Sequence, residues 1–112
     1  MNPDYVPRRG DLVWVTFGAR VGHEQTGRRP ALVLSREPYN RRIGLFVCFP
    51  ITSKRKGYPF EVPLPTGIPV VGVVLADQIK SFDWRERDVE FICSISEELC
   101  SASLAKLRPM IE

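Results

Sequence analysis

The chain is poor in the residues that build disulfide frameworks and metal centres. Its 112 residues include only three cysteines, Cys48, Cys93 and Cys100, an odd number whose spacing matches no zinc pattern. His23 is the one histidine, and no His, Asp and Glu residues cluster at ligand spacing. The sequence therefore predicts no disulfide framework, no metal ion and no cofactor. The cysteines are explained as small buried apolar residues in a reducing compartment.

Long apolar runs are also missing. No stretch approaches the roughly 18 residues that a membrane-spanning helix needs, and the first nine residues lack the apolar segment of a secretory signal. With 44% hydrophobic and 26% charged residues, the composition is that of one globular domain. We therefore expect a single domain over residues 1–112 that is soluble, cytoplasmic and not bound to a membrane.

Turn-forming residues are abundant, with ten prolines and eight glycines, which argues against a helical bundle or a coiled coil. Short apolar or alternating segments predict strands at residues 11–17, 30–35, 45–51, 60–62, 70–76 and 89–95. The polar segments 39–44 and 77–87 are interpreted as turn regions with room for a helical turn each.

A helix is expected after the last strand. Ser96 is a plausible N-cap, and Pro109 predicts that the helix ends at Arg108. Apolar residues then recur at helical spacing and would pack on a sheet, namely Cys100, Leu104, Leu107 and Ile111. The expected fold is mainly β, a small barrel of five to six antiparallel strands with a C-terminal helix.

Charge is distributed unevenly along the chain. Residues 1–56 hold 11 Lys and Arg against 4 Asp and Glu, a net charge of +7, whereas residues 57–112 hold 5 against 9, a net charge of −4. This asymmetry indicates a basic face that could bind a polyanion. The alternative is scattered charge that a compact fold mixes together.

The long segment 18–28 has three glycines and no periodicity, which is more than a plain hairpin needs and favours a functional loop. If the turn after the second strand is centred on Asn40 and Arg41, antiparallel pairing places Arg29 beside Thr52. The loop that carries Glu24 would end at that same edge, where the basic loop 54–56 begins.

This grouping suits phosphate chemistry. The planar guanidinium of Arg29 can bind a phosphate through two hydrogen bonds, the Thr52 hydroxyl can donate to an oxygen, and Glu24 can accept a proton. RNA carries its own nucleophile, the 2′-OH, so such a site need only align it and stabilise charge. Each residue also has a plainer explanation: Arg29 could pair with Glu24 or Asp77, Thr52 could simply end a strand, and Glu24 could be solvated.

Several ordered segments resemble the MazF/PemK family of toxins from bacterial toxin–antitoxin systems. They are Gly10-Asp-Leu-Val-Trp-Val15, Gly22-His-Glu-Gln-Thr-Gly-Arg-Arg-Pro-Ala31, Pro50-Ile-Thr-Ser53, Lys56-Gly-Tyr-Pro-Phe-Glu-Val62 and Val74-Leu-Ala-Asp-Gln-Ile-Lys-Ser-Phe-Asp-Trp-Arg85. The resemblance implies a small SH3-like barrel, a homodimer, and metal-independent cleavage of single-stranded RNA at short sequences. The products would be a 2′,3′-cyclic phosphate and a 5′-OH, and translation and growth would be inhibited.

By that resemblance, Arg29 and Thr52 form the catalytic pair and Glu24 supports them. His23 and Arg28 fall on variable positions, and His23 is better explained as a surface residue. The proline-rich stretch 63–69 is unlike a typical member, which bears on base preference and loop shape.

The basic rim and its aromatic neighbours are expected to bind RNA by tracking the backbone and stacking bases. This set comprises Phe17, Gln25, Arg28, Lys54, Arg55, Lys56, Tyr58, Gln78 and Lys80. An antitoxin with an acidic, flexible tail would cover the same groove. Two rival hypotheses are a toxin of the same fold that binds DNA gyrase, and a catalytically silent module that binds nucleic acid.

The expected homodimer has a structural argument of its own. A barrel this small should leave Phe82 and Trp84 too little room for burial within one chain, so the region 70–84 would supply apolar contact to a partner. Trp14 is likewise assigned to the core or an interface.

Overall fold

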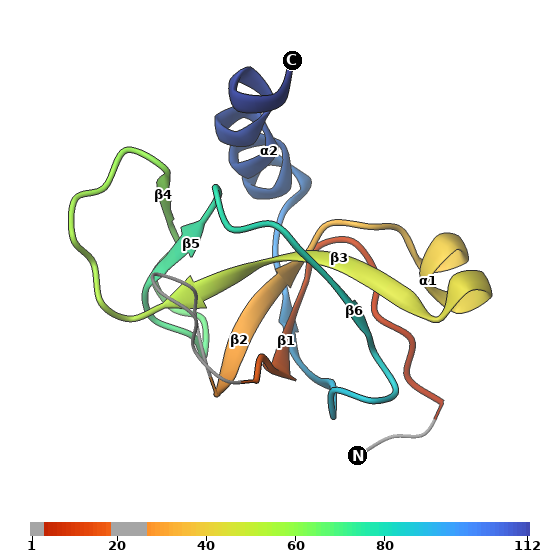
Figure 1. Cartoon of the computed structure of the whole chain (residues 1–112). Helices are drawn as coiled ribbons and strands as arrows, with labels where there is room; N and C mark the ends of the chain where they lie inside the picture. Colours follow the sequence, from red (N-terminus) through yellow and green to blue (C-terminus); the bar gives the residue numbers. More distant parts are fainter. Residues whose placement is uncertain (1–3, 19–26) are drawn as a thin grey trace.

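The computed structural model describes residues 4–18 and 27–112. Its elements, in chain order, are β1 (Asp11–Thr16), β2 (Arg28–Val33), α1 (Glu37–Ile43), β3 (Leu45–Thr52), β4 (Glu61–Pro63), β5 (Val73–Leu75), β6 (Lys80–Asp83), β7 (Glu90–Ser94) and α2 (Glu97–Ile111). All strand pairs in this part of the chain are antiparallel, in the order β4-β5-β3-β2-β1-β7, with β6 also paired to β3 (Figure 1). The predicted mainly β fold with a C-terminal helix is confirmed.

The long strand β3 organises the sheet because both of its edges are used. One edge pairs with β2, and the other is shared by β6 along its first half and β5 at its end. The interpretation of residues 77–87 as a turn region with room for a helical turn is therefore wrong, because this segment contains β6. The described residues form seven strands where five or six were expected. Only Phe82 is buried in β6, so this polar strand gives little hydrophobic signal.

Alternating side chains divide the core between the two faces of the sheet. Leu12, Leu32 and Phe49 pack on one face, where α2 covers them through Cys100 and Leu107. The opposite face carries a second cluster, made of Val13, Val15, Phe17, Ala31, Val33, Phe46, Cys48, Phe82, Trp84 and Val89. Burial raises the pKa of the Cys48 thiol to about 12. As predicted, this cysteine serves as a small apolar residue.

Helix α1 occupies the connection between β2 and β3, part of which the sequence analysis interpreted as a turn region with room for a helical turn. Its start has Pro38 in the first turn, and its end has Gly44 in the left-handed conformation at φ 83°, the usual geometry of a C-terminal cap. Asn40 lies fully buried within it. The Asn40 side chain donates to the carbonyl oxygens of Pro7, at 2.7 Å, and Ser35, at 3.1 Å. It thereby joins the N-terminal segment to the end of β2.

Trp84 and Phe82 are buried within the single chain, at 9% and 8% exposure. The Trp84 indole donates to the Asn40 carbonyl at 2.8 Å, so α1 supplies the cover that the sequence argument did not foresee. The prediction that these two rings must be covered by a second copy is therefore wrong.

Helix α2 starts as predicted, with the Ser96 hydroxyl accepting from the Leu99 amide at 3.3 Å. It does not end at Arg108 but continues through Pro109 to Ile111. Ile111, the last residue of the expected apolar stripe, is 73% exposed. The proline sits in the exposed final turn, where only the last few residues of the helix depend on the hydrogen bond that it cannot donate. Neither helix of the described chain has the length and apolarity needed to cross a membrane.

Candidate active site at one end of the sheet

The register of β2 and β3 matches the expected one. Ala31 pairs with Pro50 and Val33 with Cys48. Arg29 lies two residues before Ala31 in its strand, and Thr52 two residues after Pro50 in the other. Because side chains alternate, Arg29 and Thr52 belong to the same end and the same face of the strand pair.

Thr52 is held firmly at this end. Its side chain is buried, with 6% of the residue exposed, and its Oγ1 accepts the Lys54 amide at 3.1 Å. That bond uses an acceptor site and leaves the hydroxyl proton able to donate to a ligand. On the other side, Thr52 pairs with Val73 of β5, and Gly72 packs directly over its carbonyl oxygen.

Gly72 is required by this packing. A Cβ at this position would lie 2.1 Å from the Thr52 carbonyl oxygen, far inside van der Waals contact. Its φ of 140° also falls in the region that favours glycine. The absence of a side chain at Gly72 is therefore the feature that lets β5 approach Thr52.

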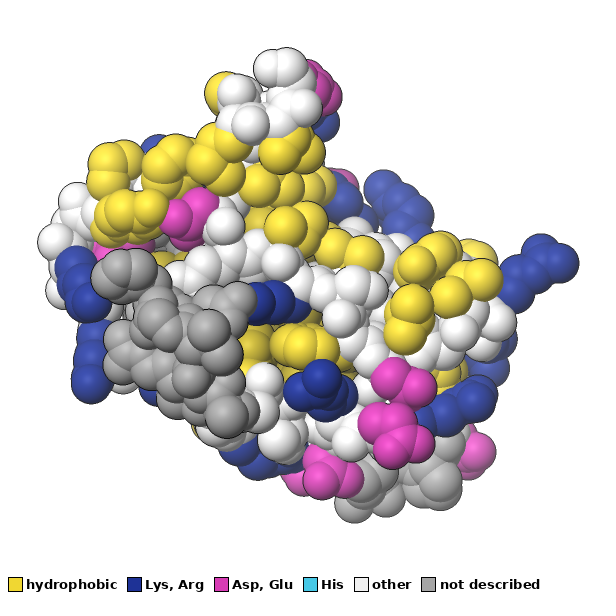
Figure 2. Space-filling view, in the orientation of Figure 1, with side chains coloured by type: hydrophobic (Ala, Val, Ile, Leu, Met, Phe, Trp, Pro, Cys, Tyr) yellow, Lys and Arg dark blue, Asp and Glu magenta, His cyan; other side chains and the backbone are white. Residues whose placement is uncertain are grey.

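A basic loop follows Thr52. Lys54, Arg55 and Lys56 are all exposed, and Figure 2 shows Lys and Arg side chains along the left edge, where Figure 1 draws the loop between β3 and β4. The Glu61 carboxylate fixes the loop by accepting the amides of Lys56, at 3.0 Å, and Gly57, at 3.1 Å. Sequence reasoning missed this role, for which the proximity of Glu61 to the basic run was the only signal.

Tyr58 lies at the end of the same loop. It is 45% exposed, and its hydroxyl donates to Asp77 Oδ2 at 2.5 Å. This hydrogen bond to the carboxylate raises the pKa of Tyr58, so the phenol stays protonated at neutral pH. The ring is thus held in place while remaining open to a stacking partner.

Asp77 and Gln78 lie next to this tyrosine. Asp77 Oδ1 and Gln78 Oε1 are buried and find no hydrogen-bond partner within the described chain. The expected role of Gln78 in RNA binding stays a prediction.

Three other predicted residues do not join Arg29 and Thr52 in this group. Arg28 alternates with Arg29, and its guanidinium is paired with Glu90 at 3.0 Å. Phe17 is 8% exposed and packs edge-on against Phe82, so its ring belongs to the core and offers no face to a base. Lys80 pairs with Cys48 of β3. Cys48 lies four residues before Thr52, which is about 13 Å along the strand.

The predicted residues Glu24 and Gln25, together with His23, lie outside the described residues. Over residues 4–18 and 27–112, no three His, Cys, Asp or Glu side chains are grouped as metal ligands. The described site thus consists of an arginine, a buried hydroxyl, a tyrosine and exposed cations. These groups bind phosphates and bases.

These features define a small antiparallel β-protein with exposed cations in the loop at one end of its sheet. A family model described as PemK-like, MazF-like toxin of type II toxin-antitoxin system matches residues 8–111, and the chain belongs to this family. It is 46% identical over 107 residues to the endoribonuclease toxin MazF of Escherichia coli K12, with 96% of each chain covered.

Solved structures agree. The chain superposes on the crystal structure of MazF from Deinococcus radiodurans with a TM-score of 0.92 and 49% identity, covering 96% of this chain and 98% of that one. A MazE–MazF complex from the same organism gives a TM-score of 0.84 and 45% identity, covering 96% and 97%. The resemblance on which the sequence prediction rested is confirmed.

Proposed function

We propose that this chain is a metal-independent, sequence-selective endoribonuclease that cleaves single-stranded RNA and acts as the toxin of a type II toxin–antitoxin system. The endoribonuclease activity agrees with the names of its relatives. The observation that carries the mechanism is the position of Arg29 and Thr52 at one end and on one face of β2 and β3, beside the basic loop.

In the proposed reaction the RNA supplies the nucleophile. The 2′-OH loses its proton and its oxygen attacks the adjacent phosphorus, while the bond from phosphorus to the 5′ oxygen breaks and that oxygen takes up a proton. The products are a 2′,3′-cyclic phosphate and a 5′-OH. No water enters the bond and no metal ion is needed to activate one.

Arg29 is assigned the stabilisation of charge on the phosphate oxygens. A guanidinium is a permanent cation and a poor base, which suits it to this role. The Thr52 hydroxyl would donate to a non-bridging oxygen, and Glu24 would accept the 2′-OH proton. Lys54, Arg55 and Lys56 would hold the flanking phosphates, with Tyr58 stacking on a base.

We further propose a protein partner. An antitoxin with an acidic, flexible tail would neutralise the toxin by covering the exposed cations of the loop after β3. The MazE–MazF complex shows that a relative at 45% identity binds a second protein. RNA cleavage and antitoxin binding would both take place in the cytoplasm.

A homodimer is also proposed. Its support does not come from Phe82 and Trp84, which are buried, but from large apolar side chains that the single chain leaves exposed. Phe91 on β7 is 51% exposed and Trp14 on β1 is 39% exposed. Exposed aromatic surface of this kind is typical of protein interfaces.

The test is incubation of the purified protein with a long RNA, followed by sequencing of the new 5′-OH ends and analysis of the 3′ ends. Cuts at a short recurrent sequence with cyclic phosphates support the proposal. Binding without cuts would favour the silent nucleic-acid module. Inhibition of DNA gyrase without cuts would favour the gyrase alternative, which the endoribonuclease names of the relatives do not support.

A further inference from the structure

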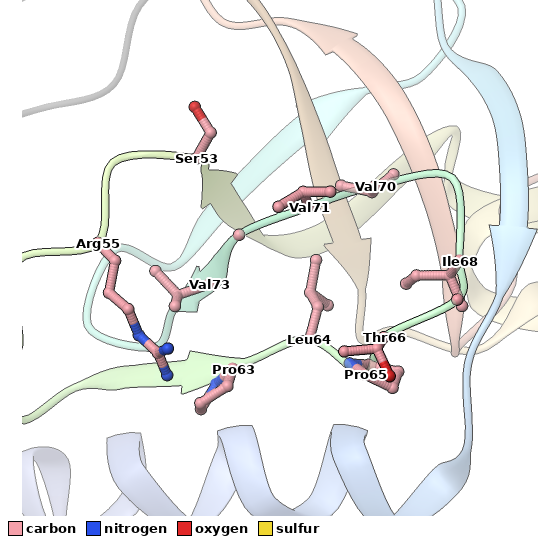
Figure 3. A pocket seen from close by; sticks show the side chains of 12 residues that line it. Ser53, Arg55, Pro63, Leu64, Pro65, Thr66, Ile68, Val70, Val71 and Val73 are labelled. Atoms are coloured by element: carbon pink, nitrogen blue, oxygen red, sulfur yellow. The ribbon is translucent and has the colours of Figure 1, made fainter.

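A pocket of about 340 Å³ lies between the basic loop and the proline-rich segment that joins β4 to β5. Its lining is mostly apolar, with Pro63, Val71 and Val73 among its walls and Arg55 as its one charged residue. Figure 3 shows the Arg55 side chain extending toward Pro63 on one side of the pocket. The volume falls within the range of about 300–1,000 Å³ that is usual for small-ligand sites.

The pocket continues the row of residues that carries the catalytic pair. Thr52 pairs with Val73, and Val73 pairs with Pro63 on its other side. Paired residues share a face of the sheet, so this row runs from Thr52 across β5 to β4. Neighbouring strands are about 5 Å apart, which places Val73 one strand spacing from Thr52 and Pro63 two.

Two details tie the pocket to Thr52 more closely. Ser53, which lines the pocket, is the next residue in the chain, and Gly72, another lining residue, contacts the Thr52 carbonyl oxygen. An RNA strand whose phosphate is bound at Thr52 therefore has its neighbouring nucleotide beside the pocket.

We propose that this pocket binds one unpaired nucleobase next to the cleaved phosphate and so contributes to sequence selectivity. The inference rests on the proposed function. The apolar walls suit the faces of a base, while Arg55 suits the phosphate attached to it. The adjacent Lys54 and Lys56 give the mouth the charge that a polyanion requires.

Val71 gives the inference its sharpest test. It lines the pocket and is 81% exposed, so its side chain is open to a ligand. A base lying against it would remove that surface from water. Because Val71 is so exposed, its truncation should leave the fold intact. Ile111, a β-branched residue 73% exposed at the end of α2 and absent from the pocket lining, provides the matched control.

The experiment uses the whole protein and short single-stranded RNAs of about ten nucleotides. An abasic ribonucleotide replaces each position around the cut in turn, and kcat/KM is measured. For the wild type, removing the bound base should lower kcat/KM by about 5- to 150-fold at one position of the RNA. In Val71→Ala this loss in kcat/KM should be about 3-fold smaller, and the losses at the other positions should be unchanged. Ile111→Ala should behave as wild type.

Equal abasic penalties in wild type and Val71→Ala would overturn the pocket assignment while leaving the endoribonuclease intact. Equal penalties together with weaker antitoxin binding by Val71→Ala would assign the pocket to a protein segment instead. If the wild type cleaves no RNA, the proposed function fails. Binding of a base in the pocket is then tested by fluorescence anisotropy, which compares the affinities of the same variants for base-bearing and abasic strands.

Discussion

Replacing Gly72 by alanine should damage stability and catalysis together. The new Cβ would lie 2.1 Å from the Thr52 carbonyl oxygen, 2.8 Å from the carbonyl carbon and 3.1 Å from Ser53 Cα. Ordinary contact requires β3 and β5 to separate by about 1 Å or more. The neighbours are backbone atoms, so no side chain can rotate away. Overpacking and backbone strain together predict a loss of about 2–4 kcal/mol in the free energy of unfolding.

For a chain of this size, that loss lowers the unfolding temperature by about 10 °C. Displacing Thr52 by about 1 Å should also reduce kcat by about 10- to 100-fold at temperatures where the variant is folded. Thermal unfolding followed by circular dichroism and cleavage of a short RNA would measure both effects.

Gly44→Ala is the matched control. Gly44, at the end of α1, also has a positive φ, of 83°, but a Cβ there meets no atom within 4 Å. It should lose only about 1 kcal/mol, through backbone strain alone, and should retain activity. A Gly72→Ala protein that unfolds at the wild-type temperature and cuts RNA at the wild-type rate would refute the argument that Gly72 positions Thr52.

The remaining predictions concern the reaction and the assembly. Arg29→Ala should lose at least about 100-fold in cleavage rate with unfolding unchanged, and Arg29→Lys should also be poor because a point charge cannot replace the fork. Arg28→Ala should lower the cleavage rate far less, because the Arg28 guanidinium already pairs with Glu90. Equal losses of rate at Arg28 and Arg29 would contradict the assignment of Arg29 to the phosphate. A 2′-deoxy nucleotide on the 5′ side of the cut should stop cleavage while barely weakening binding, and EDTA should change nothing; cleavage of the deoxy strand would exclude attack by the 2′-OH. Light scattering at micromolar concentration should give the mass of a dimer, and full activity from a monomer would rule the dimer out as the active form.

The register of β2 and β3 was predictable because antiparallel pairing leaves one free parameter, the centre of the connection. Centring it on Asn40 and Arg41 was enough to place Arg29 and Thr52 at the same end of the sheet. The conformation of the connection did not matter. The sequence left room for a helical turn there, and the helix α1 fills the connection and keeps the same centre, so the predicted pairing holds.

What the sequence could not reveal was the burial of polar residues by distant parts of the chain. Asn40 reads as a turn residue, yet it is fully buried and bonded to Pro7 and Ser35. Trp84 reads as an exposed aromatic, yet Asn40 accepts its indole N–H. Two of these three hydrogen bonds, Asn40 to Pro7 and Trp84 to Asn40, join residues more than thirty positions apart, so they leave no local signature in the sequence.

The candidate site also has one part that could be predicted from the sequence and one part that could not. The proposed catalytic pair, Arg29 and Thr52, follows from strand parity, which also explains why Arg28 and Arg29, adjacent in sequence, lie on different faces. The pocket beside Thr52 does not follow from parity alone. It exists because Gly72 lets β5 approach β3 and because the proline-rich segment 63–69 then returns over Val73. The proline-rich stretch 63–69 therefore begins two strands from the proposed catalytic threonine. This is the position from which a loop can change base preference without altering the chemistry.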